Sequence, residues 1–241
     1  NKLGQSLFDR STQGLTLTLF GKGLLEESQH MQSAAERLQR LAQGHTQTLT
    51  GRIRLSVNEL IAQYCLPQII PSFMDSFPSL SVEVDVSNET TSLDKRDADI
   101  AVRMFPPTQL EIVARHLLDV PLGFFSSKEY IDKHGHPKNI EELFKLRVLG
   151  YDRDRQFEEG GQRNGFNIKN ENFKFRCDFM PLHLELAIRH GGILVTHQAL
   201  ARKMGLLEIN VDIDLPDLPV YLACHKDIQH NKNIRTLMDF L

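Results

Sequence analysis

The spacing of apolar residues divides the chain into a polar amino-terminal fifth and a longer part built from strands and helices. Ile53, Leu55 and Val57 alternate as in a half-buried strand, and apolar residues then recur at helical spacing as far as Phe73. The period changes at Asn58-Glu59. In an open α/β sheet such a change marks the carboxyl end of a strand, where a crevice beside the next helix binds small ligands. Asn58 and Glu59 are therefore the first candidates for ligand contacts, with helix capping by Asn58 as the alternative.

The same patterns predict the elements downstream. Strands are expected at 80–86, 98–102, 147–150, 173–177 and 193–196, and helices at 128–133, 140–145, 182–190, 198–203 and 233–241. Residues 120–126 are expected to begin a second unit, and residues 218–224 to cross back to the first. Asn164-Gly165, between two potential strands in 157–168, predicts a hairpin. Strand–helix–strand order favours a parallel sheet with right-handed crossovers, so the fold class is α/β. Crossings near 118–122 and 222–226 predict two lobes that close on a ligand.

The amino-terminal fifth predicts a turn, a short strand and one long helix. Residues 9–14 have turn composition, and Leu15–Thr18 form a strand that returns from it, with Thr18 placed to cap the next helix. From Leu24 to His45, bulky and small residues alternate in steps of four and three, which is typical of a seam for a partner helix. The alternative is a helix that lies on the core of its own domain.

Composition narrows the possible classes of protein. A length of 241 residues with 41% hydrophobic residues allows two compact units, and a net charge of −3 limits nucleic-acid contact to a local patch. Three cysteines without C-x-x-C spacing predict buried free thiols rather than disulfides or a zinc knuckle. No apolar run approaches the roughly 18–20 residues of a membrane helix, and the first residues lack a signal-peptide core. These features predict a cytoplasmic protein without membrane contact.

Motifs for catalysis and metal binding are missing from the sequence. It contains no G-x-S-x-G, H-E-x-x-H, P-loop or G-x-G-x-x-G, which disfavours an enzyme, and no cofactor is expected. His134 and His136 lie in a polar turn without a suitable third ligand, which disfavours a metal site. His183 and His190 share a helix face and are expected to be partly buried helix residues.

Several motifs, in order along the chain, resemble the LysR-type transcriptional regulators. The stretch that contains LFDR, GLTLTLFGKGLLEE and a long helix resembles the end of their winged helix-turn-helix, the wing and the linker helix. The remaining matches are GRIRLSV, LPQIIPSFMDSFPSL, SLDKRDADIAVR, VARHLL, FFSSKEYIDKHGHP, IEELFK, LHLELAIRHGGILVTHQALAR, LPVYLACHKD and NIRTLMDFL. The resemblance covers essentially the whole chain. Most of the helix-turn-helix itself is absent from this sequence.

The resemblance implies a domain organisation and a function. Residues 1–20 would be the remnant of the winged helix-turn-helix, 21–45 a dimerising linker helix, 46–51 a hinge and 52–241 an effector-binding domain. That domain would be two-lobed and similar to the type 2 periplasmic solute-binding proteins, with lobe I at 52–118 and 225–241 and lobe II at 119–224. The implied protein is a DNA-binding regulator, a homotetramer built as a dimer of dimers, in which a small effector between the lobes changes the tetramer geometry on DNA. The alternative functions are a solute-binding or sensing module without DNA binding, and an enzyme that processes amines or amino acids.

Candidate effector contacts lie at strand ends and helix starts, where the family holds small effectors. The resemblance and these positions together give Asn58, Glu59, Thr90, Arg103, Asp152, Asp178 and Thr196. Because acidic groups outnumber the basic one, a cationic effector such as an amine is favoured, although such carboxylates are also ordinary helix caps. Arg103 has two alternatives, a ligand carboxylate or a salt bridge with Asp97 or Asp99.

Candidate DNA contacts lie around the expected wing. Double-stranded promoter or operator DNA is the implied partner, and its phosphates would be contacted by Arg10, Ser11, Thr12, Thr18 and Lys22.

Overall fold

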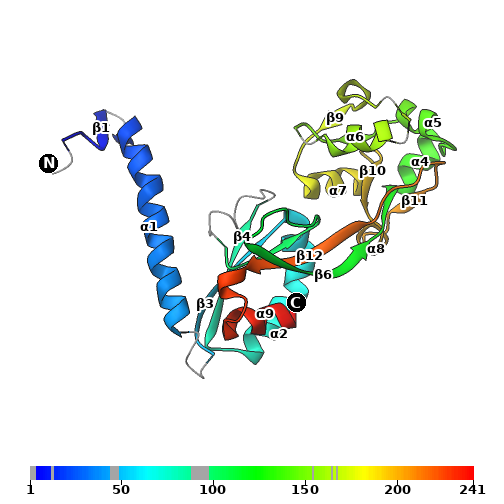
Figure 1. Ribbon diagram of the computed structural model, residues 1–241. Coiled ribbons are helices and arrows are strands. Elements are labelled where there is room, and N and C mark those ends of the chain that lie inside the picture. The colour runs from blue at the N-terminus through cyan, green and yellow to red at the C-terminus, as the bar shows by residue number, and fades with distance from the viewer. Residues whose placement is uncertain are drawn as a thin grey trace.

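A hairpin and a long helix precede two lobes in the structure, which is a computed structural model (Figure 1). The structure describes residues 4–11, 14–43, 49–87, 98–153, 155–163, 165–166 and 168–241. Within these ranges, no helix has both the length and the apolar character that crossing a membrane requires.

The amino-terminal hairpin pairs β1 (Phe8–Ser11) with β2 (Gly14–Leu17) and leads into α1 (Leu19–Gln43). Thr18 Oγ1 accepts a hydrogen bond from the Gly21 amide at 2.9 Å, which confirms the predicted cap. The expected turn at 9–14 is wrong in its first half, because pairing with β2 draws residues 9–11 into a strand.

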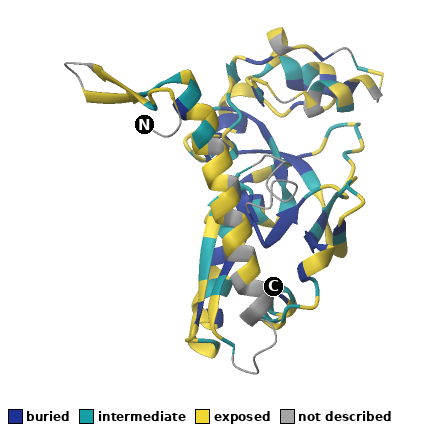
Figure 2. Cartoon of the chain, turned by 60° about the vertical axis from the view of Figure 1, so that its left-hand side comes forward, coloured by how far each residue is buried: buried dark blue, intermediate teal, exposed yellow. Residues whose placement is uncertain are grey.

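Helix α1 stands apart from the lobes (Figure 1), and most of its described residues are exposed (Figure 2). Leu25, Met31 and Leu38 are 45%, 75% and 71% exposed. This exposure argues against the alternative in which the helix lies on a core of its own chain, and it leaves the apolar seam accessible to another helix.

Lobe I is built on a five-stranded sheet of order β4-β3-β5-β12-β6. Its strands are β3 (Gly51–Val57), β4 (Leu80–Val86), β5 (Ile100–Arg103), β6 (Ile112–Val120) and β12 (Leu218–His225). The first three run parallel, as predicted, whereas β12 is antiparallel to β5 and β6. Helices α2 (Leu66–Ser76) and α9 (Lys232–Phe240) pack on one face, where the Phe73 ring lies 5.3 Å from that of Phe240.

The helix predicted after Asn58-Glu59 is divided into two parts. Residues Ile61–Cys65 form a π-helical turn, η1, and α2 follows it, with Pro67 in its first turn and Pro71 inside. A π turn displaces one residue from the regular register, and such turns are frequent at functional sites.

Lobe II has a second sheet, of order β10-β7-β11, made from β7 (Leu122–Ser126), β10 (Leu194–His197) and β11 (Leu207–Ile209). A parallel bridge between Val148 and Ile193 connects β10 to β8 (Leu149–Gly150), which pairs with β9 (Phe175–Arg176). Helices α4 (Lys128–His134) and α5 (Ile140–Lys145) pack with Phe124, and α7 (Met180–Ile188) and α8 (Gln198–Lys203) pack with Phe125. Because Phe124 and Phe125 are successive strand residues, the two helix pairs cover opposite faces. The short 3-10 turn η2 (Asn170–Asn172) also belongs to lobe II, whereas η3 (Lys226–Ile228) follows β12 in lobe I.

The hairpin predicted around Asn164-Gly165 is wrong, because residues Gln156–Arg163 form helix α6. Gly165 has φ +81° and its amide donates to the Gln162 carbonyl, while the Phe166 amide donates to the Gly161 carbonyl. Gly165 therefore ends helix α6, a role that glycine with positive φ commonly fills. Asn164 itself is outside the described residues.

The chain returns from lobe II to lobe I earlier than expected. It leaves lobe I between β6 and β7, at Pro121, and re-enters between β11 and β12, across 210–217. The expected return near 222–226 does not agree with this, because the whole of β12, from Leu218 onward, pairs with β6.

The three cysteines are free thiols with different surroundings. Cys224 is buried and Cys177 half-buried, whereas Cys65 is exposed. The expectation of buried thiols is therefore wrong for Cys65, since apolar neighbours in the sequence do not place every residue of a helical turn on its buried face.

Candidate functional site

A buried polar group occupies the ends of β3 and β5 in lobe I. Arg103 is 7% exposed, and its Nη1 donates to the carbonyls of Ser56 and Val102 at 3.2 and 3.0 Å. Its Nη2 donates to Ser56 Oγ at 2.9 Å, and that hydroxyl donates to Asp85 Oδ2 at 3.3 Å. Burial lowers the pKa of Arg103, and the charge of Asp85 opposes this effect.

Asp85 is the acidic partner that sequence analysis missed at Arg103. Asp85 lies opposite Ser56 in the parallel register of β3 and β4. Once both strands were recognised, aligning them in this register would have placed Asp85 near Arg103. Asp97 and Asp99 were the two salt-bridge partners expected for Arg103. Asp99 accepts a hydrogen bond from the Arg54 amide at 2.8 Å, and Asp97 is outside the described residues.

Asn58 caps the helix that follows it, which confirms the alternative given for this residue. Its Oδ1 accepts a hydrogen bond from the Ile61 amide at 2.9 Å, and its Nδ2 lies 3.6 Å from Met104 Sδ. Asn58 therefore lies beside the end of β5, and Glu59, half-buried, is next to it. The structure brings Asn58, Glu59 and Arg103 to one end of the lobe I sheet.

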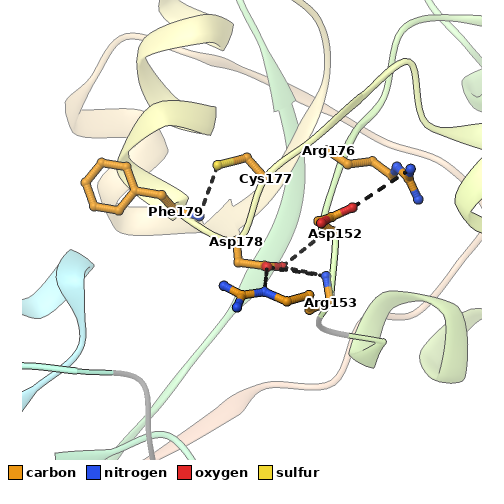
Figure 3. Close-up of polar contacts among 6 residues, drawn as sticks. All are labelled: Asp152, Arg153, Arg176, Cys177, Asp178 and Phe179. Carbon is orange, nitrogen blue, oxygen red and sulfur yellow. Dashed lines mark hydrogen bonds and ion pairs between the residues drawn. The ribbon is translucent and has the colours of Figure 1, made fainter. Parts of the chain in front are cut away.

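The two candidate carboxylates of lobe II lie together and are already paired with cations (Figure 3). Asp178 Oδ1 accepts from the Asp152 amide at 2.9 Å, and Asp178 Oδ2 accepts from Arg153 Nε at 2.9 Å. Arg176 lies 3.8 Å from Asp152. The preference for a cationic effector rested on an excess of carboxylates, and these arginines remove that excess. No observation supports the amine preference.

Two buried polar atoms in lobe II have no hydrogen-bond partner within the described part of the chain. They are Thr196 Oγ1 and His183 Nε2, on residues that are 1% and 2% exposed. The His183 ring centroid lies 5.6 Å from that of Tyr151 and 6.0 Å from that of Phe175. His183 lies in α7 as expected, but it is almost fully buried rather than partly buried. His190 is exposed instead, and its Nδ1 lies 2.9 Å from Ser127 Oγ.

The π-helical turn of lobe I is in contact with lobe II. Leu60 and Tyr64 belong to one apolar cluster with Leu184, Leu194 and Ala201 of lobe II. Burial raises the pKa of Tyr64, and Glu185 of α7 raises it further. Although Cys65 is exposed, nearby protein atoms partly desolvate its thiol and raise its pKa, while Lys203 of α8 lowers it. The turn therefore lies near both α7 and α8.

Unfolding should become easier below about pH 6.5, the ordinary histidine value, because of His183 and His197. Burial lowers the pKa of both residues in the folded chain, partly opposed at His183 by a backbone hydrogen bond with Cys177 and by Asp178. The unfolded chain then binds protons first, so stability is complete above this value and is lost as the pH falls toward the folded-state pKa. Urea unfolding of the wild type, His183→Phe and His197→Gln from about pH 7.5 to about pH 5 measures this. Each variant should show a shallower decline, and three identical slopes would contradict the prediction.

The remaining candidates divide between exposed and undescribed residues. Arg10 and Lys22 are exposed, and the Thr18 hydroxyl, besides capping α1, donates to the Ser6 carbonyl at 2.9 Å. Thr12, Thr90 and the side chain of Ser11 are outside the described part of the chain.

Comparisons with known proteins agree on one family. The family model for the LysR substrate binding domain matches residues 46–241. The regulator CrgA of Neisseria meningitidis serogroup C is 30% identical over 156 residues, which cover 62% of this chain and 50% of CrgA. An HTH-type transcriptional repressor of Pseudomonas aeruginosa is 26% identical over 149 residues, covering 62% of this chain and 47% of the repressor. The chain thus spans about half the length of the curated relatives it matches.

Solved structures give the same fold. CrgA of Neisseria meningitidis superposes with a TM-score of 0.73 at 22% identity, covering 99% of this chain and 83% of that one. The virulence activator AphB of Vibrio cholerae gives 0.71 at 19% identity, covering 99% and 84%. With the two lobes and the preceding helix described above, these matches show that the chain belongs to the family of LysR-type transcriptional regulators and contains their substrate-binding domain.

Proposed function

We propose that this chain is the linker helix and effector-binding part of a cytoplasmic DNA-binding regulator, and that a small molecule binds between its lobes. The observation that carries the proposal is the pair of chain crossings, at Pro121 and across 210–217, which connect two separately packed lobes. Such connections permit one lobe to rotate against the other. A ligand that contacts both lobes stabilises the closed arrangement by its differential affinity.

The proposed ligand contacts lie where the lobes meet. Lobe I would contribute Asn58, Glu59 and Arg103 at its strand ends, and lobe II would contribute Thr196 together with Asp152, which follows β8, and Asp178, which follows β9. Thr90 belongs to the proposal through the family resemblance alone. One solved neighbour, the CcmR regulatory domain of Synechocystis, is in complex with 2-PG, which supports a ligand-binding role for this fold.

Helix α1 supports oligomerisation rather than an isolated solute-binding module. Its exposed Leu25, Met31 and Leu38 are separated by six and seven residues, close to the seven-residue repeat of a helix-pairing seam. We propose that α1 pairs with α1 of a second copy, and that two such dimers form a tetramer that holds its DNA-binding parts at a defined spacing. Arg10 and Lys22, in the hairpin and at the start of α1, would contact phosphates. The ligand would then change DNA geometry through the tetramer.

Removal of residues 1–43 should reduce the oligomeric mass of this chain by at least half. The deleted segment contains α1 and leaves the whole matched domain, 46–241, in place. The double variant Met31→Glu/Leu38→Glu should have the same effect. Pairing of the helices would remove the two new carboxylates from water without giving them a partner, which is costly. Sedimentation equilibrium measures the mass, with Gln32→Glu, also exposed on α1, as the matched control. An unchanged mass in both variants would contradict the role of α1.

A further inference from the structure

Thr196 and Tyr151 lie toward the same end of two neighbouring parallel segments. The parallel bridge pairs Val148 with Ile193, and each chain runs three residues further in the same direction, to Tyr151 just past the end of β8 and to Thr196 near the end of β10. Alternation along the strands puts Thr196 on the same face as Leu194, and Tyr151 on the same face as Leu149. Leu149 and Leu194 belong to one buried cluster. The unpartnered hydroxyl therefore lies on the face of lobe II that carries this cluster.

His183 reaches the same level from helix α7. This helix packs against β7 and β10, and its Leu184 and Ala187 belong to the cluster that contains Leu194. His183 is one turn closer than Ala187 to the amino end of the helix, and its ring lies 5.6 Å from that of Tyr151. The two unpartnered atoms, His183 Nε2 and Thr196 Oγ1, thus lie at the same end of lobe II. The carboxyl ends of parallel strands are the usual ligand position in open α/β sheets.

The cluster beside these two atoms also includes residues of lobe I. Leu60 and Tyr64, at the π-helical turn, contribute to it. The two atoms are therefore part of the region that closes when the lobes approach each other. A buried polar atom without a partner costs free energy in the unliganded protein, and a ligand recovers this cost by supplying the hydrogen bond.

The chemistry of His183 determines what kind of group it accepts. Its ring makes a backbone hydrogen bond with Cys177, and burial lowers the pKa of the ring, so the neutral form predominates at neutral pH. Because Nε2 has no partner within the described residues, we assign the contact with the Cys177 backbone to Nδ1, as the nitrogen that carries the hydrogen. Nε2 then carries a lone pair and accepts a hydrogen bond. A hydroxyl group can donate to Nε2 and accept from Thr196 Oγ1 at the same time.

We propose that His183 Nε2 and Thr196 Oγ1 bind the hydroxyl group of an uncharged aromatic effector, a compound of the phenol class. The rings of Tyr151 and Phe175 beside His183 favour an aromatic body, because aromatic rings pack well on one another. This inference rests on the proposed function for the position of the ligand, and it adds the chemical class.

Phenol is the probe, with toluene as the match that lacks the hydroxyl and benzoate as the charged comparison. Binding is measured by thermal shift and by the ¹⁵N resonances of the histidine rings in the full 241-residue chain. Phenol should bind more tightly than either comparison compound and shift the Nε2 resonance of His183. Thr196→Val should weaken phenol binding about tenfold or more and leave toluene binding unchanged. His183→Gln, which retains a polar side chain, checks that the ring nitrogen is the acceptor.

The unliganded proteins provide a second measurement. Thr196→Val should not lower the melting temperature, because no bond is lost, whereas Ser126→Ala should lower it, because Ser126 Oγ donates to the Gly192 carbonyl at 2.8 Å. A fall in melting temperature for Thr196→Val would mean that an ordered water already satisfies the hydroxyl, and would overturn the inference. Absence of phenol binding would also overturn it. Neither result affects the proposed function, which fails separately if no compound of any class changes DNA binding by the protein with its DNA-binding domain.

Discussion

Gly192→Ala is expected to lower the free energy of unfolding by about 3 kcal/mol or more. Gly192 has φ +151°, which L side chains rarely adopt, and an added Cβ would lie 2.4 Å from the Arg147 carbonyl oxygen. That oxygen cannot move away, because it accepts the Ile193 amide at 2.8 Å. The Gly192 carbonyl is also held, by Ser126 Oγ. Backbone strain and overlap therefore add at a point where two sheet segments of lobe II are joined.

Equilibrium urea unfolding measures the loss, and Gly160→Ala is the matched control. Gly160 lies in α6 with nothing within 4 Å of an added Cβ, so alanine there should raise stability by about 0.5–1 kcal/mol through helix propensity. If the two variants changed stability to the same extent, the close approach at Gly192 would not be real.

Arg103→Met should lower the free energy of unfolding by about 3–5 kcal/mol, since it removes a buried charge and leaves its partners behind. The Ser56 and Val102 carbonyls lose their donor, and Asp85 loses the nearby cation. Arg52→Met is the control on the same sheet. Arg52 pairs with Glu83 at 3.3 Å, but the side chains are 36% and 43% exposed, so its loss should cost about 1 kcal/mol or less.

Thermal and urea unfolding of both arginine variants test this contrast. A second substitution, Asp85→Asn, should recover part of the loss in Arg103→Met, because it removes the unpaired charge. An equal cost for Arg52→Met and Arg103→Met would show that the end of β5 is more hydrated than the structure indicates.

Periodicity predicted most regular elements, because burial on one face leaves a repeat in the sequence. The strands at Gly51–Val57 and Leu80–Val86 and the helix Gln198–Lys203 are examples. Strand β6 was missed, since it lies at the edge of its sheet and most of its residues are half-buried or exposed. Strand β11 has three residues, too few to show a repeat.

The positions of the candidate residues within their strands and helices were predicted, but their pairings were not. Strand ends and helix starts follow from the local pattern, and they located Asn58, Arg103 and Thr196. The partners of Arg103 depend on which strands are neighbours and in which register, and no local pattern contains that information. The same holds for Asp178, whose partner Arg153 lies 25 residues earlier in the chain.

The two crossings between the lobes begin at paired residues, Val120 and Leu218, at the end of β6 and the start of β12. Lobe II is therefore suspended from lobe I by a two-stranded antiparallel ribbon, whose register shifts between Val220 and Tyr221. Such a ribbon resists stretching and shear, because both would break its ladder of hydrogen bonds, but it twists readily, most of all at a bulge. Under the proposed function, we therefore expect motion between the lobes to be mainly a rotation about one axis, so that ligands of different shape would differ in the angle they select rather than in the direction of movement.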